Sequence, residues 1–336
     1  MPPLGRSALV LLPAIACFVA TGDPFCLKAG FIGVLLQIVA DQARPPSALV
    51  LVHGLVIAGL IKLFCLALPS PWSFALLCAG SAALAAWLGR FGGAWRSLGD
   101  FAFMSALYSC MAFDVSPAGV AAGYRHLLSW YGLALVPPMA FAWWRGRVPQ
   151  GARAARDTVD RAAMDAAITR LVSVFLGAAA VHCFHLADGE WLIWSTASVA
   201  TGSVISSWRK SGDRAAGVCA GVAIGAALSW LILLLLPDAT RHGGMLPAVC
   251  LLGVAVSRAA CRDYRLAIFI RSMLCVVAAV FAGHGFGIGL LRIENVLSGG
   301  LIGAAVTLLY SVTRQIQTNP GNFSNSAQDM AHYRRW

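Results

Sequence analysis

The chain has 336 residues, of which 59% are hydrophobic and only 12% are charged, and its mean hydropathy is +0.75. Soluble domains carry about 25% charged residues, so this composition excludes an ordinary soluble protein and indicates a membrane protein. The net charge of +11 would suit a nucleic-acid-binding protein, but no basic–aromatic module accompanies it. Membrane insertion explains the excess of positive charge, and we expect no nucleic-acid partner.

Twelve apolar stretches follow one another along the chain, separated by short polar breaks. They cover residues 7–22, 29–40, 46–68, 71–89, 100–113, 119–143, 167–186, 190–206, 215–236, 245–257, 266–284 and 294–313. Several are shorter than the roughly 20 residues that cross a bilayer unaided, so tilted or half-length helices are expected. The first stretch is interpreted as a retained helix rather than a secretory signal peptide. The predicted fold is an all-α polytopic membrane protein with about 12 transmembrane helices.

Basic residues fall in every second break between these stretches. The set contains 19 of the 25 Lys and Arg residues, namely Arg6, Arg44, Arg90, Arg96, six arginines from Arg145 to Arg170, Arg209, Lys210, Arg214, Arg258, Arg262, Arg265, Arg314, Arg334 and Arg335. Basic loops stay in the cytoplasm during membrane insertion. The alternation therefore predicts a multi-pass protein of the bacterial inner (plasma) membrane with both termini in the cytoplasm.

Four basic landmarks recur in the two halves of the chain at a nearly constant offset. They pair Arg6 with Arg170, Arg44 with Arg214, Arg125 with Arg292, and the loop of Arg90 with that of Arg258. This offset predicts two parallel six-helix repeats, residues 1–144 and 167–313, which meet where transport sites usually form. An Arg-rich cytoplasmic linker, 145–166, joins them, and a disordered cytoplasmic tail, 314–336, follows. Regular loop spacing without duplication is the competing explanation.

Three motifs in the second half occur in a specific order. They are Trp191-x-x-x-Ser195, Arg214-x-x-Gly217-x-x-x-Gly221, and a last helix that runs from Arg292 to a glycine pair at 299 and 300. This order resembles the fusaric acid resistance-like (FUSC) proteins, the aromatic acid exporter family. The resemblance covers residues 167–313, and it reaches the first half only through the repeat.

The resemblance implies a transporter that exports aromatic carboxylates and related organic anions, often with a periplasmic adaptor subunit. Exporters of this type carry a large cytoplasmic domain between two membrane units, whereas this chain has only the short linker. Plant relatives are anion channels, so a passive anion channel built as a homodimer is the alternative function. We therefore expect the lipid bilayer and a small organic anion as partners, with proton exchange as a driver of export.

Five residues are candidates for the transport pathway. Arg292 and Arg125 each precede a predicted sixth helix on its outer side, where a guanidinium and the helix dipole both favour an anion, although contact with lipid headgroups is an alternative. Lys62 lies inside a predicted helix and Trp194 could stack on an aromatic substrate, with snorkelling of Lys62 and an interfacial aromatic belt for Trp194 as the alternatives. Glu294 is the candidate for a coupled proton, with a helix cap or an ion pair to Arg292 as the alternative.

Six glycines indicate close packing of helices, because a helix face without side chains lets a neighbouring backbone approach. They are Gly217, Gly221 and Gly225, which repeat every four residues, and Gly299, Gly300 and Gly303. A permeation path lined by backbone is the alternative. Arg271, one turn into its stretch, is expected to snorkel toward the cytoplasm.

No metal, cofactor or catalytic residue is expected. The ten cysteines show no C-x-x-C spacing, and His182 and His185 lack a third ligand that could complete a metal site. The chain has no Walker motif for ATP. An integral membrane transferase is the third functional hypothesis, but it needs acid and base residues clustered at one membrane face, and the polar residues here are scattered. The protein is therefore not expected to be an enzyme.

Overall fold

A computed structural model describes residues 3–43, 45–113, 116–145, 156–235, 246–247, 249–250, 253–254, 257, 261 and 263–318. These residues form helices and no strands. The α-helices are α1 (Pro3–Thr21), α2 (Pro24–Ala43), α3 (Ser47–Ala67), α4 (Pro71–Trp87), α5 (Gly93–Met111), α6 (Pro117–Ser129), α7 (Tyr131–Arg145), α8 (Arg156–Cys183), α9 (Glu190–Val199), α10 (Val204–Leu235), α12 (Tyr264–Ala279) and α13 (Gly287–Thr318). A short 3₁₀ segment, η1 (Leu88–Phe91), follows α4, and a π-helical turn, η3 (Val280–His284), follows α12.

The expected all-α class is confirmed for the described residues. Seven of their helical segments are long and apolar enough to cross a membrane, and these lie in α2, α3, α4 with η1, α8, α10, α12 with η3, and α13. The segment Gly5–Thr21 of α1 is a shorter apolar helix. The count of twelve spans, the repeat arrangement and the side of each terminus stay predictions.

Several helices begin earlier than the apolar stretches suggested, because they continue into polar sequence. Helix α10 begins at Val204 rather than 215, so Arg209, Lys210 and Arg214 lie on a helix and not in a loop. Helix α8 begins at Arg156 and runs across the predicted boundary at 166 between linker and second repeat. Arg and Lys are good helix formers, and their long side chains reach polar surroundings from a helix.

Two of the predicted stretches are interrupted. Residues 119–143, expected as one helix, form α6 and α7, which are separated at Trp130. Residues 190–206 form the short helix α9, which ends at Val199, and the first residues of α10. Gly202 follows with a φ of +78°, and a Cβ at this position would lie 2.8 Å from the backbone nitrogen of Ala166. Because only glycine fits this turn, the chain can reverse direction there and begin α10.

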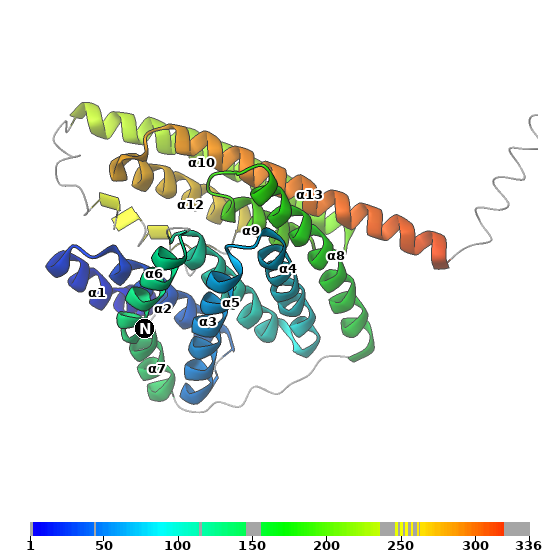
Figure 1. Cartoon of the computed structure of the whole chain (residues 1–336), viewed down its shortest axis with the longest axis horizontal. Coiled ribbons are helices and arrows are strands. Elements are labelled where there is room, and N and C mark those ends of the chain that lie inside the picture. The colour runs from blue at the N-terminus through cyan, green and yellow to red at the C-terminus, as the bar shows by residue number, and fades with distance from the viewer. Residues whose placement is uncertain are drawn as a thin grey trace, which may run out of the picture.

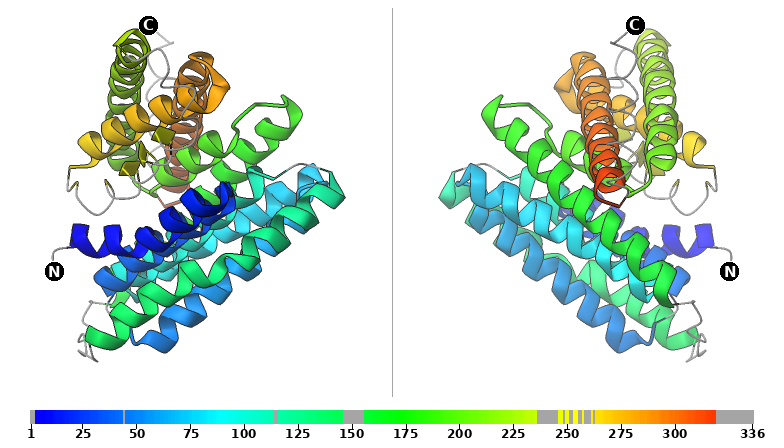
Figure 2. Two further views of the ribbon diagram at one scale, coloured as in Figure 1. Left: turned by 90° about the vertical axis from the view of Figure 1, so that its left-hand side faces the viewer. Right: turned by 90° about the vertical axis from the view of Figure 1, so that its right-hand side faces the viewer.

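The helices form two packed groups that meet obliquely (Figures 1 and 2). Helices α2 to α7 form one group, and its core includes buried side chains of α8 and α9, which pack against it. Helices α10, α12 and α13 run side by side as the second group, with a separate core around Val218, Val222 and Ile268. The two cores leave a boundary between them, and this boundary holds the candidate site.

Ion pairs join several helix ends at one end of the molecule. Arg6 of α1 and Arg145 of α7 both contact Asp41 near the end of α2, at 3.1 and 2.8 Å. Asp165 of α8 pairs with Arg314 near the end of α13. These contacts bring together the ends that the basic pattern assigns to the cytoplasm.

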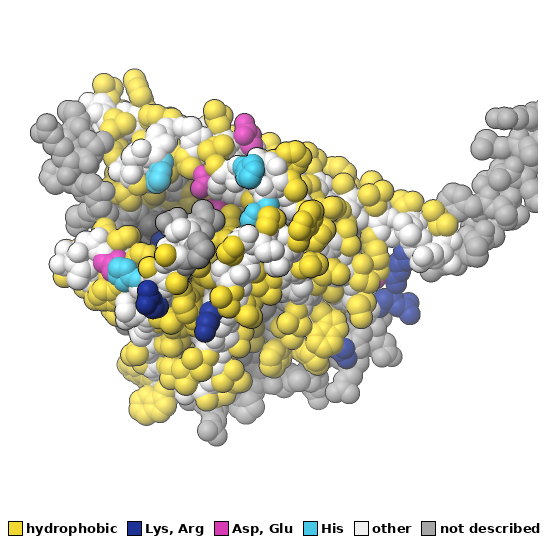
Figure 3. Space-filling view, in the orientation of Figure 1, with side chains coloured by type: hydrophobic (Ala, Val, Ile, Leu, Met, Phe, Trp, Pro, Cys, Tyr) yellow, Lys and Arg dark blue, Asp and Glu magenta, His cyan; other side chains and the backbone are white. Residues whose placement is uncertain are grey.

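The surface of the molecule is mainly apolar. Large hydrophobic side chains are exposed along several helices, among them Leu63 and Leu66 of α3 and Leu231, Leu234 and Leu235 of α10. Figure 3 shows one face covered by such side chains, with few charged groups. A surface of this kind suits contact with lipid tails rather than water.

Some predictions fall outside the described residues. They include most of the linker (146–155), the tail beyond Thr318, much of the stretch 245–257, and the positions of Arg44, Arg258 and Arg262.

Candidate functional site

A cavity of about 110 Å³ lies at the boundary between the two helix groups. Its wall combines side chains from α2, α5, α9, α10, α12 and α13 with one residue of the segment 246–257. The lining residues are Phe31, Met104, Tyr108, Trp191, Trp194, Arg214, Val218, Val254, Ile268, Arg271, Cys275, Arg292 and Val296. Three arginines and four aromatic side chains thus face one space, and the described residues contribute no carboxylate to its lining.

Close packing of α10 on α12 sets the position of two of these arginines. A Cβ on Gly217 would lie 3.0 Å from the carbonyl oxygen of Arg265, and one on Gly225 would lie 2.7 Å from that of Met273. A Cβ on Gly221 would collide with the Phe269 carbonyl. The bare glycine face lets the two backbones approach, which brings Arg214 of α10 near Arg271 of α12.

The glycines of α13 likewise allow its backbone to approach that of α9 closely. A Cβ on Gly299 would collide with the Leu192 carbonyl, and one on Gly303 would lie 2.9 Å from the Thr196 carbonyl. A Cβ on Gly300 would lie 2.9 Å from the Ser211 hydroxyl of α10. These contacts hold Arg292, two turns earlier on α13, beside the tryptophans of α9.

Arg214 is the most deeply buried of the three arginines, with only 8% of its surface exposed. Its Nη1 donates hydrogen bonds to the Ser198 hydroxyl at 2.7 Å and to the Tyr264 hydroxyl at 3.1 Å. Its Nε is buried and has no hydrogen-bond partner in the described structure. A buried guanidinium donor without a partner is costly, so this atom is available to a ligand in the cavity.

Arg292 lies against an aromatic face. Its Cζ is 4.7 Å from the centroid of the Trp191 ring, which is a cation–π geometry. Its Nε donates a hydrogen bond to the Ser272 hydroxyl at 3.3 Å. Asp188 and Glu190, at the start of α9, lie within electrostatic range of this guanidinium without forming an ion pair with it.

Arg271 completes the group. Its Nε donates a hydrogen bond to the Ala267 carbonyl at 2.8 Å, one turn earlier on α12. Its guanidinium lies within electrostatic range of both Arg214 and Arg292. The three cations therefore repel one another across a space that no carboxylate of the described residues lines.

The structure separates the candidates predicted from the sequence. Arg292 and Trp194 both line the cavity. Arg125 and Lys62 are exposed side chains outside it, and Arg125 donates a hydrogen bond to the Ala121 carbonyl of its own helix at 3.3 Å. Glu294 is also exposed, and among the described residues it forms no ion pair with Arg292.

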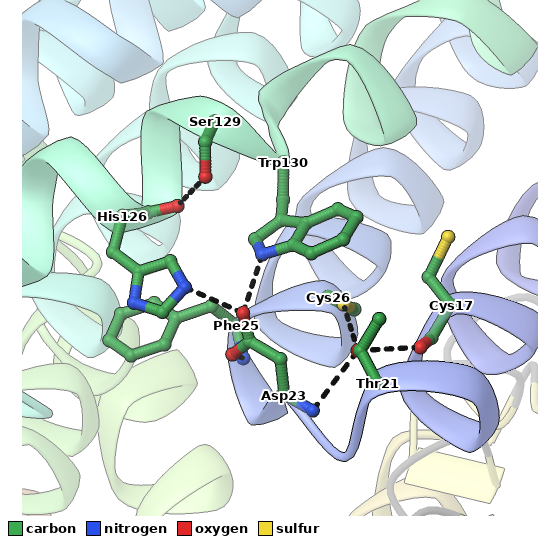
Figure 4. Close-up of polar contacts among 8 residues, drawn as sticks. All are labelled: Cys17, Thr21, Asp23, Phe25, Cys26, His126, Ser129 and Trp130. Carbon is green, nitrogen blue, oxygen red and sulfur yellow. Dashed lines mark hydrogen bonds and ion pairs between the residues drawn. The ribbon is translucent and has the colours of Figure 1, made fainter.

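Near Arg125, a polar cluster joins the loop between α1 and α2 to α6 (Figure 4). Asp23 Oδ2 accepts a hydrogen bond from the Trp130 indole at 2.7 Å and lies 2.6 Å from His126 Nε2. The Asp23 Oδ1 also accepts from the Phe25 backbone N–H at 2.9 Å. Partial burial tends to raise the pKa of Asp23, but these hydrogen bonds and the His126 charge outweigh it and lower the pKa. None of these residues belongs to the cavity lining.

In the loop that precedes α9, the pKa of an aspartate is raised, whereas that of Asp23 is lowered. Burial raises the pKa of Asp188, although His284 and Arg292 oppose the shift. The Asn295 side-chain amide donates hydrogen bonds to the carbonyls of Ala187 and Asp188 at 2.8 and 3.2 Å, which fixes the loop against α13. His, Cys, Asp and Glu residues in the described part of the chain form no group of three that could hold a metal ion.

A family model described as Fusaric acid resistance protein-like matches residues 176–306. Residues 176–306 are therefore similar to fusaric acid resistance proteins. The resemblance inferred from the tryptophan, arginine and glycine motifs is thereby confirmed over these 131 of the 336 residues. No curated protein and no solved structure matches the chain.

The fusaric acid resistance protein-like region contributes all three arginines and both tryptophans of the cavity. Phe31, Met104 and Tyr108 close the cavity from outside that region. Together with the seven described helical segments that are long and apolar enough to cross a membrane, this match supports a multi-pass membrane protein.

Sequence reasoning missed two of the three arginines in the cavity of this fusaric acid resistance protein-like region. Arg214 was attributed to a cytoplasmic break, and Arg271 was expected to snorkel toward the cytoplasm without a role in the site. The Arg271 side chain lines the cavity, and its Nε donates a hydrogen bond to the Ala267 carbonyl one turn earlier on α12. An arginine inside an apolar helix is a functional candidate by default, and this signal was present for Arg271.

Proposed function

We propose that the protein is an inner-membrane transporter that exports organic acid anions, chiefly aromatic ones, through the cavity between its two helix groups. The observation that supports this most directly is the combination of three guanidinium groups and four aromatic side chains around one cavity. The arginines can bind the carboxylate of an aromatic acid, and the aromatic side chains can contact its ring.

The chemistry of the lining favours such a ligand. A guanidinium binds a carboxylate through two parallel, charge-assisted hydrogen bonds. Trp191 and Trp194 offer ring faces and edges on which an aromatic ring can stack, and Trp194 itself packs against Phe103 with ring centroids 6.2 Å apart. Arg292 contacts Trp191, so the cationic and aromatic surfaces are continuous.

The location of the cavity supports movement of the ligand across the membrane. Sites between two helical units become accessible to opposite sides when one unit rocks against the other. We propose that the units are the repeats 1–144 and 167–313, with the termini in the cytoplasm. Proton exchange, an adaptor subunit on the periplasmic side and a homodimeric assembly belong to the same proposal.

Glu294 is less well supported as the proton carrier than the sequence alone suggested. It is exposed on α13, whereas Asp188 and Glu190 lie within electrostatic range of Arg292. A proton on either of these two carboxylates would change the charge opposite Arg292, so coupling through the start of α9 fits the geometry better.

The test is binding and transport of benzoate by the purified protein. Arg292→Ala removes a charged hydrogen-bonding group worth about 1.5–3 kcal/mol, so the Kd should rise roughly ten- to a hundred-fold. Arg125→Ala is the matched control and should leave the Kd unchanged, because Arg125 is exposed and bonded to its own helix. Equal effects of the two variants, or no binding by the wild type, would contradict the proposed site.

Proteoliposomes separate transport from passive conduction. A proton-coupled exporter should move radiolabelled benzoate against its gradient only when a pH gradient is imposed. A channel would carry benzoate current without a pH gradient, and that result would replace export by the anion-channel alternative.

A further inference from the structure

Six arginines that the structure describes within helices contact an aspartate, namely Arg6, Arg96, Arg145, Arg170, Arg265 and Arg314. Among the described residues, the cavity arginines Arg214, Arg271 and Arg292 have no such partner. The exposed Arg125, Arg161 and Arg209 also lack one, but their side chains do not face the cavity. Nearly all the ion pairs of the described chain therefore lie away from the cavity, while the cavity collects uncompensated positive charge.

Arg170 provides a direct comparison with Arg214. Both are almost fully buried, with 3% and 8% of their surfaces exposed. Arg170 meets the Asp100 carboxylate at 2.5 Å and donates to the Ala200 carbonyl at 3.3 Å. Arg214 meets only the neutral hydroxyls of Ser198 and Tyr264, and its buried Nε has no partner. Of these two buried arginines, Arg170 away from the cavity has a counter-ion, and Arg214 at the cavity has none among the described residues.

Buried charges without partners are strongly unfavourable, because neither water nor an opposite charge replaces the lost hydration. Like charges close together add to that cost, and Arg271 lies within range of the two other cations. Such a group is expected where an anionic ligand supplies the missing charge during the working cycle. The Arg214 Nε–H has no acceptor in the described structure, so the ligand is expected to place a hydrogen-bond acceptor atom there.

The number of missing charges can be counted. Arg292 is partly compensated, because Asp188 and Glu190 lie within electrostatic range of it. No protein carboxylate compensates Arg214 or Arg271 among the described residues. Two positive charges therefore remain to be neutralised, and they stand on two different helices, α10 and α12.

From this balance we infer that the cavity takes a dianion, an aromatic or similarly compact organic acid with two separate acidic groups. One acidic group binds Arg214 through its free Nε, and the other binds Arg271 on the side toward Arg292. This inference rests on the proposed function, because it assumes that the cavity is the ligand site, and it narrows the class of ligand from acids in general to diacids.

The experiment compares two ligands that differ by one charge. Isophthalate carries two carboxylates on one ring, and its monomethyl ester keeps the ring and the size but has only one charge. Binding of each to the purified full-length protein is measured by calorimetry at pH 7 in low salt. We expect isophthalate to bind at least ten-fold more tightly than the ester.

Variants then locate the second charge. Arg214→Gln and Arg271→Gln should each weaken isophthalate binding at least ten-fold and change binding of the ester by a smaller factor, so that the preference for the diacid shrinks. The comparison of the two ligands on the wild type needs no variant and stands even if a variant fails to fold.

The outcomes separate the two proposals. If the ester binds as tightly as isophthalate, the inference of a dianion is wrong, while the proposed transport of organic acids stands. If neither compound nor benzoate binds, the proposed function itself fails. If the diacid is preferred but both glutamine variants keep the full preference, the second acidic group is bound elsewhere and the assignment to Arg214 and Arg271 is wrong.

Discussion

Asp23 illustrates how one residue joins two helices at the end of the molecule opposite Asp41. Its carboxylate accepts hydrogen bonds from Trp130 and from the Phe25 N–H and contacts His126, and its pKa is lowered as a result. A lowered folded-state pKa means that the contribution to stability is complete above the ordinary value of 3.8 and is lost as the pH falls through the lower folded-state pKa.

Asp23→Asn should therefore destabilise the protein at neutral pH by about 1–2 kcal/mol, because charge-assisted hydrogen bonds become neutral ones. Thermal melting in detergent at pH 7 and at about pH 3 measures this. The difference in melting temperature between wild type and variant should shrink at the lower pH. A difference that stays constant across this range would show that the charge on Asp23 contributes nothing.

At the scale of elements, the glycine face of α10 determines how closely it approaches α12. Gly221→Ala would place a methyl group against the Phe269 carbonyl and 2.9 Å from the Ser272 Cβ. We expect a loss of about 1–3 kcal/mol of stability, since backbone cannot move aside as a side chain can. Benzoate binding should weaken as well, because Ser272 holds Arg292 at 3.3 Å.

Gly212→Ala is the matched control on the same helix. Gly212 is exposed, and no heavy atom lies within 4 Å of a Cβ at that position. Replacing glycine by alanine within a helix stabilises it by roughly 0.5–1 kcal/mol, so melting should rise slightly and binding should not change. If both variants melt alike, close packing at Gly221 is not important for the fold.

Sequence periodicity predicted the helices and those site residues that belong to a motif within a single helix. It did not predict which residues of different helices come together. The spacing of Gly217, Gly221 and Gly225 indicated a packed face, and that face contacts α12. Trp194 and Arg292 could be identified because each stands in a motif of its own helix. The gathering of Arg214 and Arg271 depends on how α10 crosses α12, which no spacing within one helix encodes.

At the scale of the whole molecule, the two halves use equivalent pairs of packed helices. The packing of α1 on α2, α2 on α7, α3 on α5 and α3 on α7 corresponds to that of α8 on α9, α9 on α13, α10 on α12 and α10 on α13. This correspondence supports the proposed repeats, with α6 and α7 together in the place of α13. The cavity draws on both halves, as expected of a site between repeats.

Two native cysteines test the proposed orientation in the membrane. Cys183 is exposed at the end of α8, on the side proposed to face the periplasm, and Cys261 is partly exposed just before α12, on the side proposed to face the cytoplasm. A membrane-impermeant maleimide should label Cys183 in spheroplasts and Cys261 only in inverted vesicles, since thiols react as thiolates in water. Cys219 is exposed in the middle of α10, where lipid should keep it unreactive. Cys183→Ser and Cys261→Ser identify each labelled site. Labelling of both from the same side would refute the proposed orientation, because the three predicted stretches between them, 190–206, 215–236 and 245–257, would then cross the bilayer an even number of times.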